Sequence, residues 1–128
     1  MSKNPKLVST QDFEDVIAVV TKYVEGLRTG RPARLAEAFH KDAVMYGFSA
    51  GELIGGSIKN LYDIIEKVGG APDVTTRLDV LAITPTTAVV RVDMEKAALG
   101  AQYQDFLTLL KLEDGWKVIA KAYHQFGD

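Results

Sequence analysis

The hydrophobic pattern of the chain changes period near residue 74, from a helical repeat to strict alternation. In the first part, apolar residues recur every three or four positions, which is typical of a helix with one buried stripe. We predict an opening helix capped by Ser9 or Thr10 and ended by Gly30. A short helix that carries Leu35, Ala36 and Phe39 follows, with Pro32 in its first turn. The stripe of the opening helix consists of Phe13, Val16, Ile17, Val20, Val24 and Leu27.

Short elements follow the two helices. The segment AVMYGF, residues 43–48, predicts a strand, and GELIGG, residues 51–56, predicts a turn and a second short strand. Ser57 is placed to cap a third helix that the pair Gly69-Gly70 ends. The apolar residues of this third helix are Ile58, Leu61, Tyr62, Ile65 and Val68.

Two antiparallel hairpins are predicted from Val74 onward. In the first, a loop around Pro85 would set Arg77 opposite Asp93, and the next pair on the same face would again join opposite charges. The order of helices and strands predicts an α+β fold, with the helices packed on one face of a curved sheet. We expect a single domain over residues 1–128.

The second hairpin carries the candidate site. Asp114-Gly115 between apolar strands is typical of a two-residue turn, and counting back from it sets Asp105 directly opposite His124. Opposed Cβ atoms lie about 4.5–5.5 Å apart. In an apolar pocket an acid either stays neutral and donates a hydrogen bond, or ionises and orients a neighbouring imidazole. We therefore predict a catalytic pair in which His124 is a candidate general base.

Composition narrows the classes of function. The net charge of −2 gives no basic face for nucleic acid, and the absence of cysteine excludes a thiol nucleophile. The two histidines, His40 and His124, lack metal-ligand spacing, so we expect neither metal nor cofactor. There is no apolar run of about 18 residues, and the start at Met1–Pro5 lacks an apolar signal core, so we expect a cytoplasmic protein.

Three stretches of the sequence resemble a known superfamily. VVTKYVEGLRTG, LAEAFHKDAVMYG and DFLTLLKLEDGWKVIAKAYH are similar to the nuclear transport factor 2-like superfamily, which includes ketosteroid isomerases, scytalone dehydratase and polyketide cyclases. Within this superfamily, the second and third stretches are most similar to a group labelled putative lumazine-binding proteins. The resemblance runs from about Phe13 to Phe126. It implies a cone-shaped fold of three helices on a strongly curved, mostly antiparallel sheet, with a cavity on the concave face and a homodimer through the convex face.

The ketosteroid isomerase pattern matches this chain only in part. The resemblance places the oxyanion-hole tyrosine of that enzyme on Tyr23 and its oxyanion-hole aspartic acid on Asp105, which implies that the Tyr23 hydroxyl points toward Asp105. His124 stands where that enzyme has a tryptophan. Its catalytic base falls on Gly47, and no carboxylate replaces that base locally. Since moving a proton on a steroid requires this base, ketosteroid isomerase activity is not expected.

Three hypotheses for function follow. The first is a protein that binds a small apolar or aromatic molecule, with Tyr23, Tyr46, Tyr103 and His40 as candidate ligand-binding residues. The second is an isomerase, dehydratase or cyclase that works without a cofactor and moves protons with the predicted catalytic pair. The third is a dimeric interaction domain whose cavity is filled by side chains. For His40, a position at a helix end also suits a purely structural role beside the helix dipole.

Overall fold

The computed structural model describes residues 8–127. Over that range the chain forms three α-helices, six strands and one short 3₁₀ turn. In chain order, these elements are α1 (Thr10–Thr29), α2 (Pro32–Ala38), β1 (Phe39–Ser49), β2 (Glu52–Ser57), α3 (Lys59–Val68), β3 (Thr75–Ile83), β4 (Thr87–Glu95), η1 (Ala98–Gly100), β5 (Gln102–Leu112) and β6 (Gly115–Phe126).

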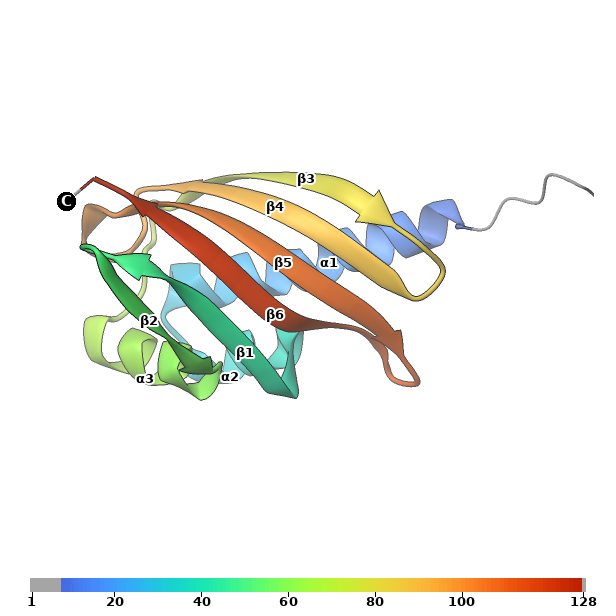
Figure 1. The fold of residues 1–128 in the computed structure, drawn as a ribbon, viewed down its shortest axis with the longest axis horizontal. Helices are drawn as coiled ribbons and strands as arrows, with labels where there is room; N and C mark the ends of the chain where they lie inside the picture. The colour runs from blue at the N-terminus through green and yellow to red at the C-terminus, as the bar shows by residue number, and fades with distance from the viewer. Residues whose placement is uncertain (1–7, 128) are drawn as a thin grey trace, which may run out of the picture.

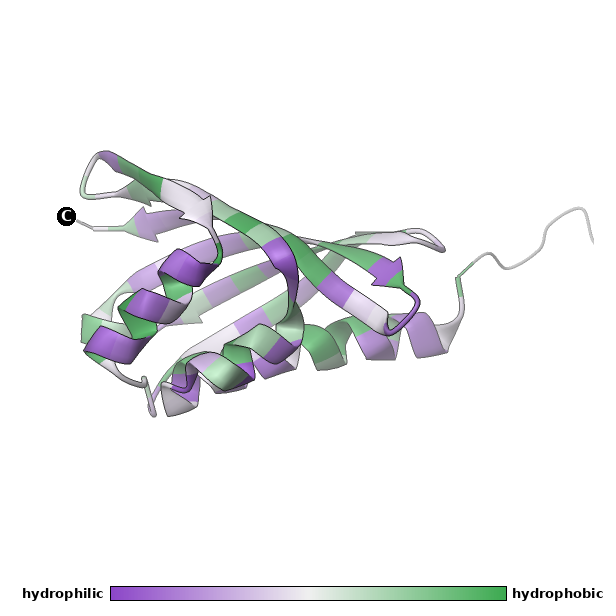
Figure 2. Cartoon of the chain, turned by 90° about the horizontal axis from the view of Figure 1, so that it is seen from below, coloured by the Kyte–Doolittle hydropathy of each residue, from purple (hydrophilic) through white to green (hydrophobic). Residues whose placement is uncertain are grey.

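The six strands form one sheet in the order β2-β1-β6-β5-β4-β3. Every neighbouring pair is antiparallel except β1 and β6, which run parallel. Figure 1 shows the sheet curving across the molecule with α1 behind it, and Figure 2 shows from below that the helices cover one face. The α+β prediction, with a mostly antiparallel sheet, is confirmed.

The predicted start and end of α1 are confirmed, and so is the predicted end of α3, whereas α3 starts differently. The Ser9 hydroxyl accepts a hydrogen bond of 3.1 Å from the backbone N–H of Asp12, and Gly30 ends α1 at a φ of 70°. The N-cap of α3 is Ile58, which makes no side-chain cap, and not the predicted Ser57. Ser57 ends β2, and its hydroxyl accepts a hydrogen bond of 3.2 Å from the backbone N–H of Lys59. Gly69 then ends this helix.

The first strand begins earlier than predicted, which corrects the assignment of Phe39 to the second helix. Phe39 has extended backbone angles and pairs with Val118 of β6. Its side chain is buried and its ring meets the ring of Tyr23 edge-on, at 5.6 Å between centroids. Packing of this ring against α1 stabilises the extended conformation at Phe39 more than another helical residue would. An edge-on aromatic pair contributes free energy beyond that of the apolar area it buries.

The predicted register of the β3–β4 hairpin is confirmed. Arg77 pairs with Asp93, and Asp79 pairs with Arg91. Arg91 donates a hydrogen bond of 3.0 Å to the Asp79 carboxylate, so the opposed charges do meet across the strands.

The predicted register of the β5–β6 hairpin is wrong. Leu112 pairs with Gly115, so the turn residues are Glu113 and Asp114. Gly115 has a positive φ of 109°, whereas the φ angles of Glu113 and Asp114 are not positive. A turn of this kind needs its left-handed glycine one position later than a type I′ turn does. An irregularity between Thr108 and Leu109 then shifts the pairing back by one residue, so beyond it the register differs from the predicted one by a single residue.

This shift separates the predicted catalytic pair. Asp105 pairs with Tyr123, whereas His124 pairs with Gln104. Because side chains alternate between the two faces of a strand, an offset of one residue moves a side chain to the other face. Asp105 is therefore buried on the concave face, with 1% of its surface exposed, while His124 is exposed on the convex face and meets the ring of Phe126 edge-on.

Candidate functional site

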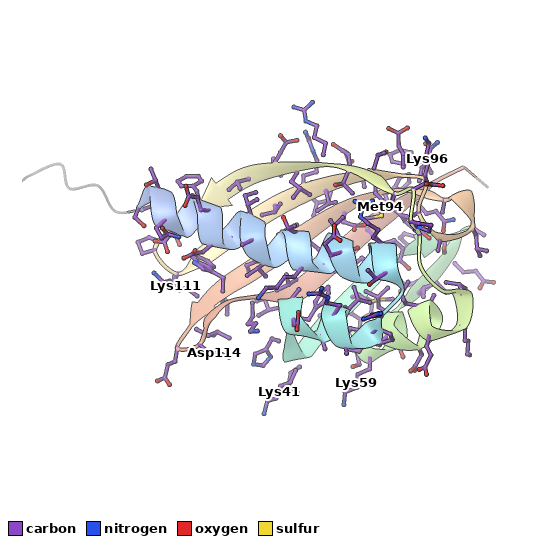
Figure 3. The ribbon with its side chains drawn as sticks, turned by 180° about the vertical axis from the view of Figure 1, so that it is seen from behind. Lys41, Lys59, Met94, Lys96, Lys111 and Asp114 are labelled. Atoms are coloured by element: carbon purple, nitrogen blue, oxygen red, sulfur yellow. The ribbon has the colours of Figure 1, made fainter. Side chains whose placement is uncertain are left out.

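A cavity of about 310 Å³ opens between the concave face of the sheet and the helices. Its wall is mostly apolar, and Met94 from β4 belongs to it (labelled in Figure 3). The helices contribute apolar side chains at Leu27, Leu61, Ile64, Ile65 and Val68. The polar side chains that reach the wall are Tyr23, Ser49, Tyr103, Lys121 and Tyr123.

Strand alternation decides which side chains reach this cavity. On β1, Met45 lies inside, whereas Tyr46 points to the convex face and is half exposed. Gly47 also lies on the inner side, but a Cβ atom there would be 2.5 Å from the carbonyl oxygen of Tyr123 and 2.6 Å from its ring. The ring of Tyr123 thus occupies the space into which a side chain at position 47 would project.

Tyr23 and Asp105 meet inside the molecule. The hydroxyl of Tyr23 donates a hydrogen bond of 2.6 Å to Oδ2 of Asp105, and each side chain is only 1% exposed. This contact confirms the prediction that the tyrosine points at the acid. The second oxygen of Asp105, Oδ1, is buried and has no hydrogen-bond partner among residues 8–127.

Lys121 is the residue of this site that the sequence analysis missed. Its side chain is 8% exposed and lines the cavity from β6. Nζ lies 5.1 Å from the ring centroid of Tyr23 and 5.3 Å from that of Tyr123. The register error had placed this lysine on the outer face. Moving the turn to Glu113-Asp114 shifts the pairing by two residues and leaves this lysine on the outer face. The irregularity between Thr108 and Leu109 shifts the pairing by one residue and turns the lysine inward.

Burial sets the proton affinities of these three groups. It raises the pKa of Asp105, although Lys121 and the hydrogen bond from Tyr23 oppose the rise. It lowers the pKa of Lys121, and the Asp105 charge opposes that fall. Burial and the neighbouring carboxylate hold the pKa of Tyr23 well above its usual value. Tyr23 is therefore a lasting hydrogen-bond donor, while the buried acid and amine are each shifted towards their neutral forms.

The remaining predicted site residues divide between two places. Tyr103 lines the cavity and its ring meets that of Tyr123 edge-on at 5.9 Å. His40 lies on β1 and accepts a hydrogen bond of 3.0 Å at Nδ1 from the backbone N–H of Asp42, away from the cavity wall. The structure thus brings Tyr23, Tyr103 and Asp105 together, and it does not bring His40, Tyr46 or His124 to them.

Two broader features bear on the class of site. Within residues 8–127, no group of three or more histidine, aspartate or glutamate side chains is arranged to hold a metal ion. No helix in the described part of the chain is long and apolar enough to cross a membrane. The segment 1–5, on which the expectation about a signal peptide rested, lies outside the described residues.

Comparison with known proteins gives a family and several relatives. The family model described as "Putative lumazine-binding" matches residues 11–124. Among curated proteins, the chain is similar to "Aldolase FrzH" from a Cladobotryum species. The two are 36% identical over 121 residues, which is 94% of this chain and 97% of the relative.

Solved structures match the fold over nearly the whole chain. A nuclear transport factor 2-like protein of unknown function from Methylobacillus flagellatus is 31% identical, with a TM-score of 0.87 over 94% of this chain and 96% of its own. One from Shewanella baltica is 29% identical, with a TM-score of 0.87 over 96% and 100%. A ketosteroid isomerase-like protein from Erwinia carotovora has the same fold at 16% identity, with a TM-score of 0.73 over 94% and 100%.

Proposed function

The chain belongs to the family described as putative lumazine-binding, and we propose that its cavity binds a small, largely apolar organic molecule that carries a polar group. The observation behind this proposal is the combination of an open volume of about 310 Å³ with an apolar wall and a few convergent polar groups. That combination is typical of small-molecule sites. Lys121 and Tyr103 are the side chains that would meet the polar group of the ligand.

The structure also bears on the hypothesis of an interaction domain without a ligand. That hypothesis requires side chains to fill the space between the helices and the sheet. The inner side chains of β1 and β6 do not fill this space. A cavity remains, and side chains from both the helices and the strands line it. Apolar surface that is left uncovered in this way is available to a ligand.

A ligand screen by thermal unfolding tests the binding proposal. We expect at least one of lumazine, riboflavin, 2-naphthol and a 3-ketosteroid to raise the melting temperature, since a ligand at a hundred times its Kd stabilises the native state by about 2.7 kcal/mol. A tryptophan at the cavity wall, Ala98→Trp, should abolish the shift, whereas Ala82→Trp on the exposed part of β3 should not. Absence of any shift across the panel, or a shift that survives Ala98→Trp, would contradict the proposal.

A second candidate function is catalysis on the bound molecule. Two observations favour it: the similarity to a protein named as an aldolase, and the contact of a buried phenol, acid and amine beside one cavity. Buried ionisable groups with shifted pKa values are frequent at catalytic sites. The groups in position for proton transfer are Tyr23, Asp105 and Lys121, and His124 is not among them because it lies on the other face.

We also propose that a second copy of the chain covers the convex face. Four neighbouring strands, β2, β1, β6 and β5, leave large apolar side chains uncovered there. A contiguous apolar area of this kind on a soluble protein is typical of an interface. The exposed side chains concerned are Val44, Tyr46, Phe48, Leu53, Phe106 and Phe126.

A further inference from the structure

We propose that Lys121 is a covalent catalytic residue, whose amine condenses with a ketone or aldehyde carbonyl of the bound molecule to form an iminium. This inference deepens the proposed function, on which it rests, because it names the substrate class and the reacting atom. The relative named as an aldolase is consistent with a carbonyl substrate, and the argument below comes from the surroundings of the lysine.

The position of Lys121 differs from that of two other lysines of the final hairpin. Lys111 donates a hydrogen bond of 2.9 Å to the Asp12 carboxylate, and Lys117 donates one of 2.9 Å to the backbone carbonyl of Glu37. The ion pairs and side-chain hydrogen bonds formed within residues 8–127 do not include Lys121. Its amine is thus buried, borders the cavity and is not committed to a structural partner.

The reaction needs no reagent besides the carbonyl compound. The nitrogen lone pair of the neutral amine attacks the carbonyl carbon, and the C=O π pair moves to oxygen, which takes up a proton to give a carbinolamine. Departure of that oxygen as water then forms the C=N bond. Overall, a carbonyl compound and an ammonium group give a protonated iminium and one water, so atoms and charge balance. The iminium withdraws electrons from the neighbouring C–H bond, which is the activation that an aldol addition requires.

The groups around Nζ suit both states of this nitrogen. Burial lowers the pKa of Lys121, which makes the reactive neutral amine available at lower pH than on an exposed lysine. The iminium carries its positive charge at the same nitrogen, near the ring faces of Tyr23 and Tyr123 at 5.1 and 5.3 Å. Aromatic faces attract a cation in this position. The buried carboxylate of Asp105 adds a favourable negative charge once the iminium has formed.

The charges at the site favour a neutral carbonyl compound over an anionic ligand. Asp105 lies buried close to Lys121, and its Oδ1 has no hydrogen-bond partner among the described residues. A carboxylate ligand beside Lys121 would be repelled by this acid, whereas a ketone or aldehyde would not. The apolar wall likewise disfavours a charged molecule.

The probe 2,4-pentanedione tests the inference directly. Condensation of one of its carbonyls with an amine releases water and leaves a conjugated enaminone, which absorbs in the near ultraviolet and needs no reductant. We expect one adduct per chain by intact mass, located on Lys121 by peptide mapping. Formation should slow at least about tenfold in Lys121→Met, while Lys117→Met, on the same strand, should react as the wild type does. Adducts spread evenly over the exposed lysines would overturn the proposal.

Two further measurements separate this inference from the binding proposal. Lys121→Arg keeps a positive charge but cannot form the enaminone, so the near-ultraviolet absorbance of the enaminone should not appear in this variant. If 2-naphthol raises the melting temperature of the wild type while the diketone leaves Lys121 unmodified, the covalent role is wrong and the binding site stands. If no compound of the ligand panel raises the melting temperature and the diketone leaves Lys121 unmodified, both proposals fall. Peptide mapping of the wild type decides the question even if a variant does not fold.

Discussion

The hydroxyl of Tyr23 on α1 donates a hydrogen bond of 2.6 Å to Asp105 on β5, which joins residues 82 positions apart in the chain. The bond fixes the rotation of α1 over the sheet, because both side chains are fully enclosed. The Tyr23 ring lies 5.1 Å from Nζ of Lys121, and the Asp105 charge acts on the same amine, so the stability of the fold and the electrostatics of the cavity depend on the same contact.

Removing this donor should cost stability. In Tyr23→Phe both oxygens of Asp105 would be buried without a donor from the described residues, and a buried polar group left unsatisfied costs about 1–3 kcal/mol. Urea unfolding at neutral pH measures the loss. Tyr62→Phe is the matched control, since the Tyr62 hydroxyl makes no hydrogen bond within residues 8–127. Equal losses in the two variants would mean that the Tyr23–Asp105 bond contributes nothing.

The acid and the amine should be energetically coupled. Asp105→Leu leaves Lys121 without its neighbouring negative charge, and Lys121→Met leaves the acid without a neighbouring positive one. We expect the double variant to be more stable than the sum of the single effects predicts, by about 0.5–3 kcal/mol. Denaturant unfolding of the four proteins gives this difference. A parallel cycle of Asp105→Leu with Lys117→Met should be additive.

The reactivity of Lys121 should depend on pH in a defined direction. Burial lowers its pKa, so enaminone formation should reach its plateau at lower pH than on exposed lysines. The titratable groups around the lysine are Asp105, Tyr23, Tyr103 and Tyr123. In Asp105→Asn the charge that favours the ammonium is gone, so the midpoint should move further down. Absorbance kinetics across pH measure it, and an unchanged or raised midpoint would contradict the assignment.

Acid should weaken the contact between α1 and the β5–β6 hairpin. The hydrogen bond from Lys111, which lies beside the start of α1 in Figure 3, lowers the pKa of Asp12, and Trp116 adds a second bond at 3.4 Å. A carboxylate with a lowered folded-state pKa stabilises the fold above its unfolded value of about 3.9, and this contribution is lost as pH falls through the folded pKa.

Melting temperatures at about pH 7 and about pH 3 measure this contribution. Asp12→Asn should narrow the gap between the two temperatures, because its side chain no longer titrates. Asp114→Asn, in the exposed turn labelled in Figure 3, serves as the control and should leave the gap unchanged. If the two melting temperatures of Asp12→Asn differ by as much as those of the wild type, the Asp12–Lys111 pair is not the cause of the loss of stability in acid.

The convex face should determine the oligomeric state. Phe48 on this face is 58% exposed, and a charge there would have to be buried without a partner if a second copy packs on this face. We expect the wild type to be a dimer and Phe48→Glu a monomer by light scattering coupled to size exclusion. Leu81→Glu, at an exposed position of β3, should remain dimeric. A monomeric wild type would refute the second-copy proposal.

Local chemistry in the sequence was enough to predict most of the fold. Ser9 and Gly30 mark the ends of α1 because a cap and a left-handed residue have specific residue preferences. The β3–β4 register followed from Arg77 and Asp93, since only one alignment pairs opposite charges. In each case the residues that determine the local structure lie within that same helix or hairpin.

The candidate site was predicted only in part, because its geometry depends on one register. The other turn that fits Leu112 to Gly115 shifts the pairing by two residues and keeps the faces. Only the irregularity beside Thr108, which nothing in the sequence marks, shifts it by one. A one-residue error exchanges the faces, so Lys121 was assigned outside and His124 inside. The Tyr23–Asp105 contact was predicted correctly because the superfamily resemblance, rather than the hairpin count, supplied it.

The packing of Tyr123 against Gly47 sets an order in which this cavity can acquire new chemistry. An aspartate at position 47 would be the simplest way to install a carboxylate base on β1, yet its Cβ would lie 2.6 Å from the Tyr123 ring. Steric overlap of that size forces the backbone or the ring to move. A smaller residue at position 123 would relieve the contact with the ring, but the carbonyl oxygen of residue 123, at 2.5 Å, would remain, so the backbone must shift as well. Evolutionary or laboratory paths that begin at Gly47 would therefore lose stability before any isomerase activity could be selected.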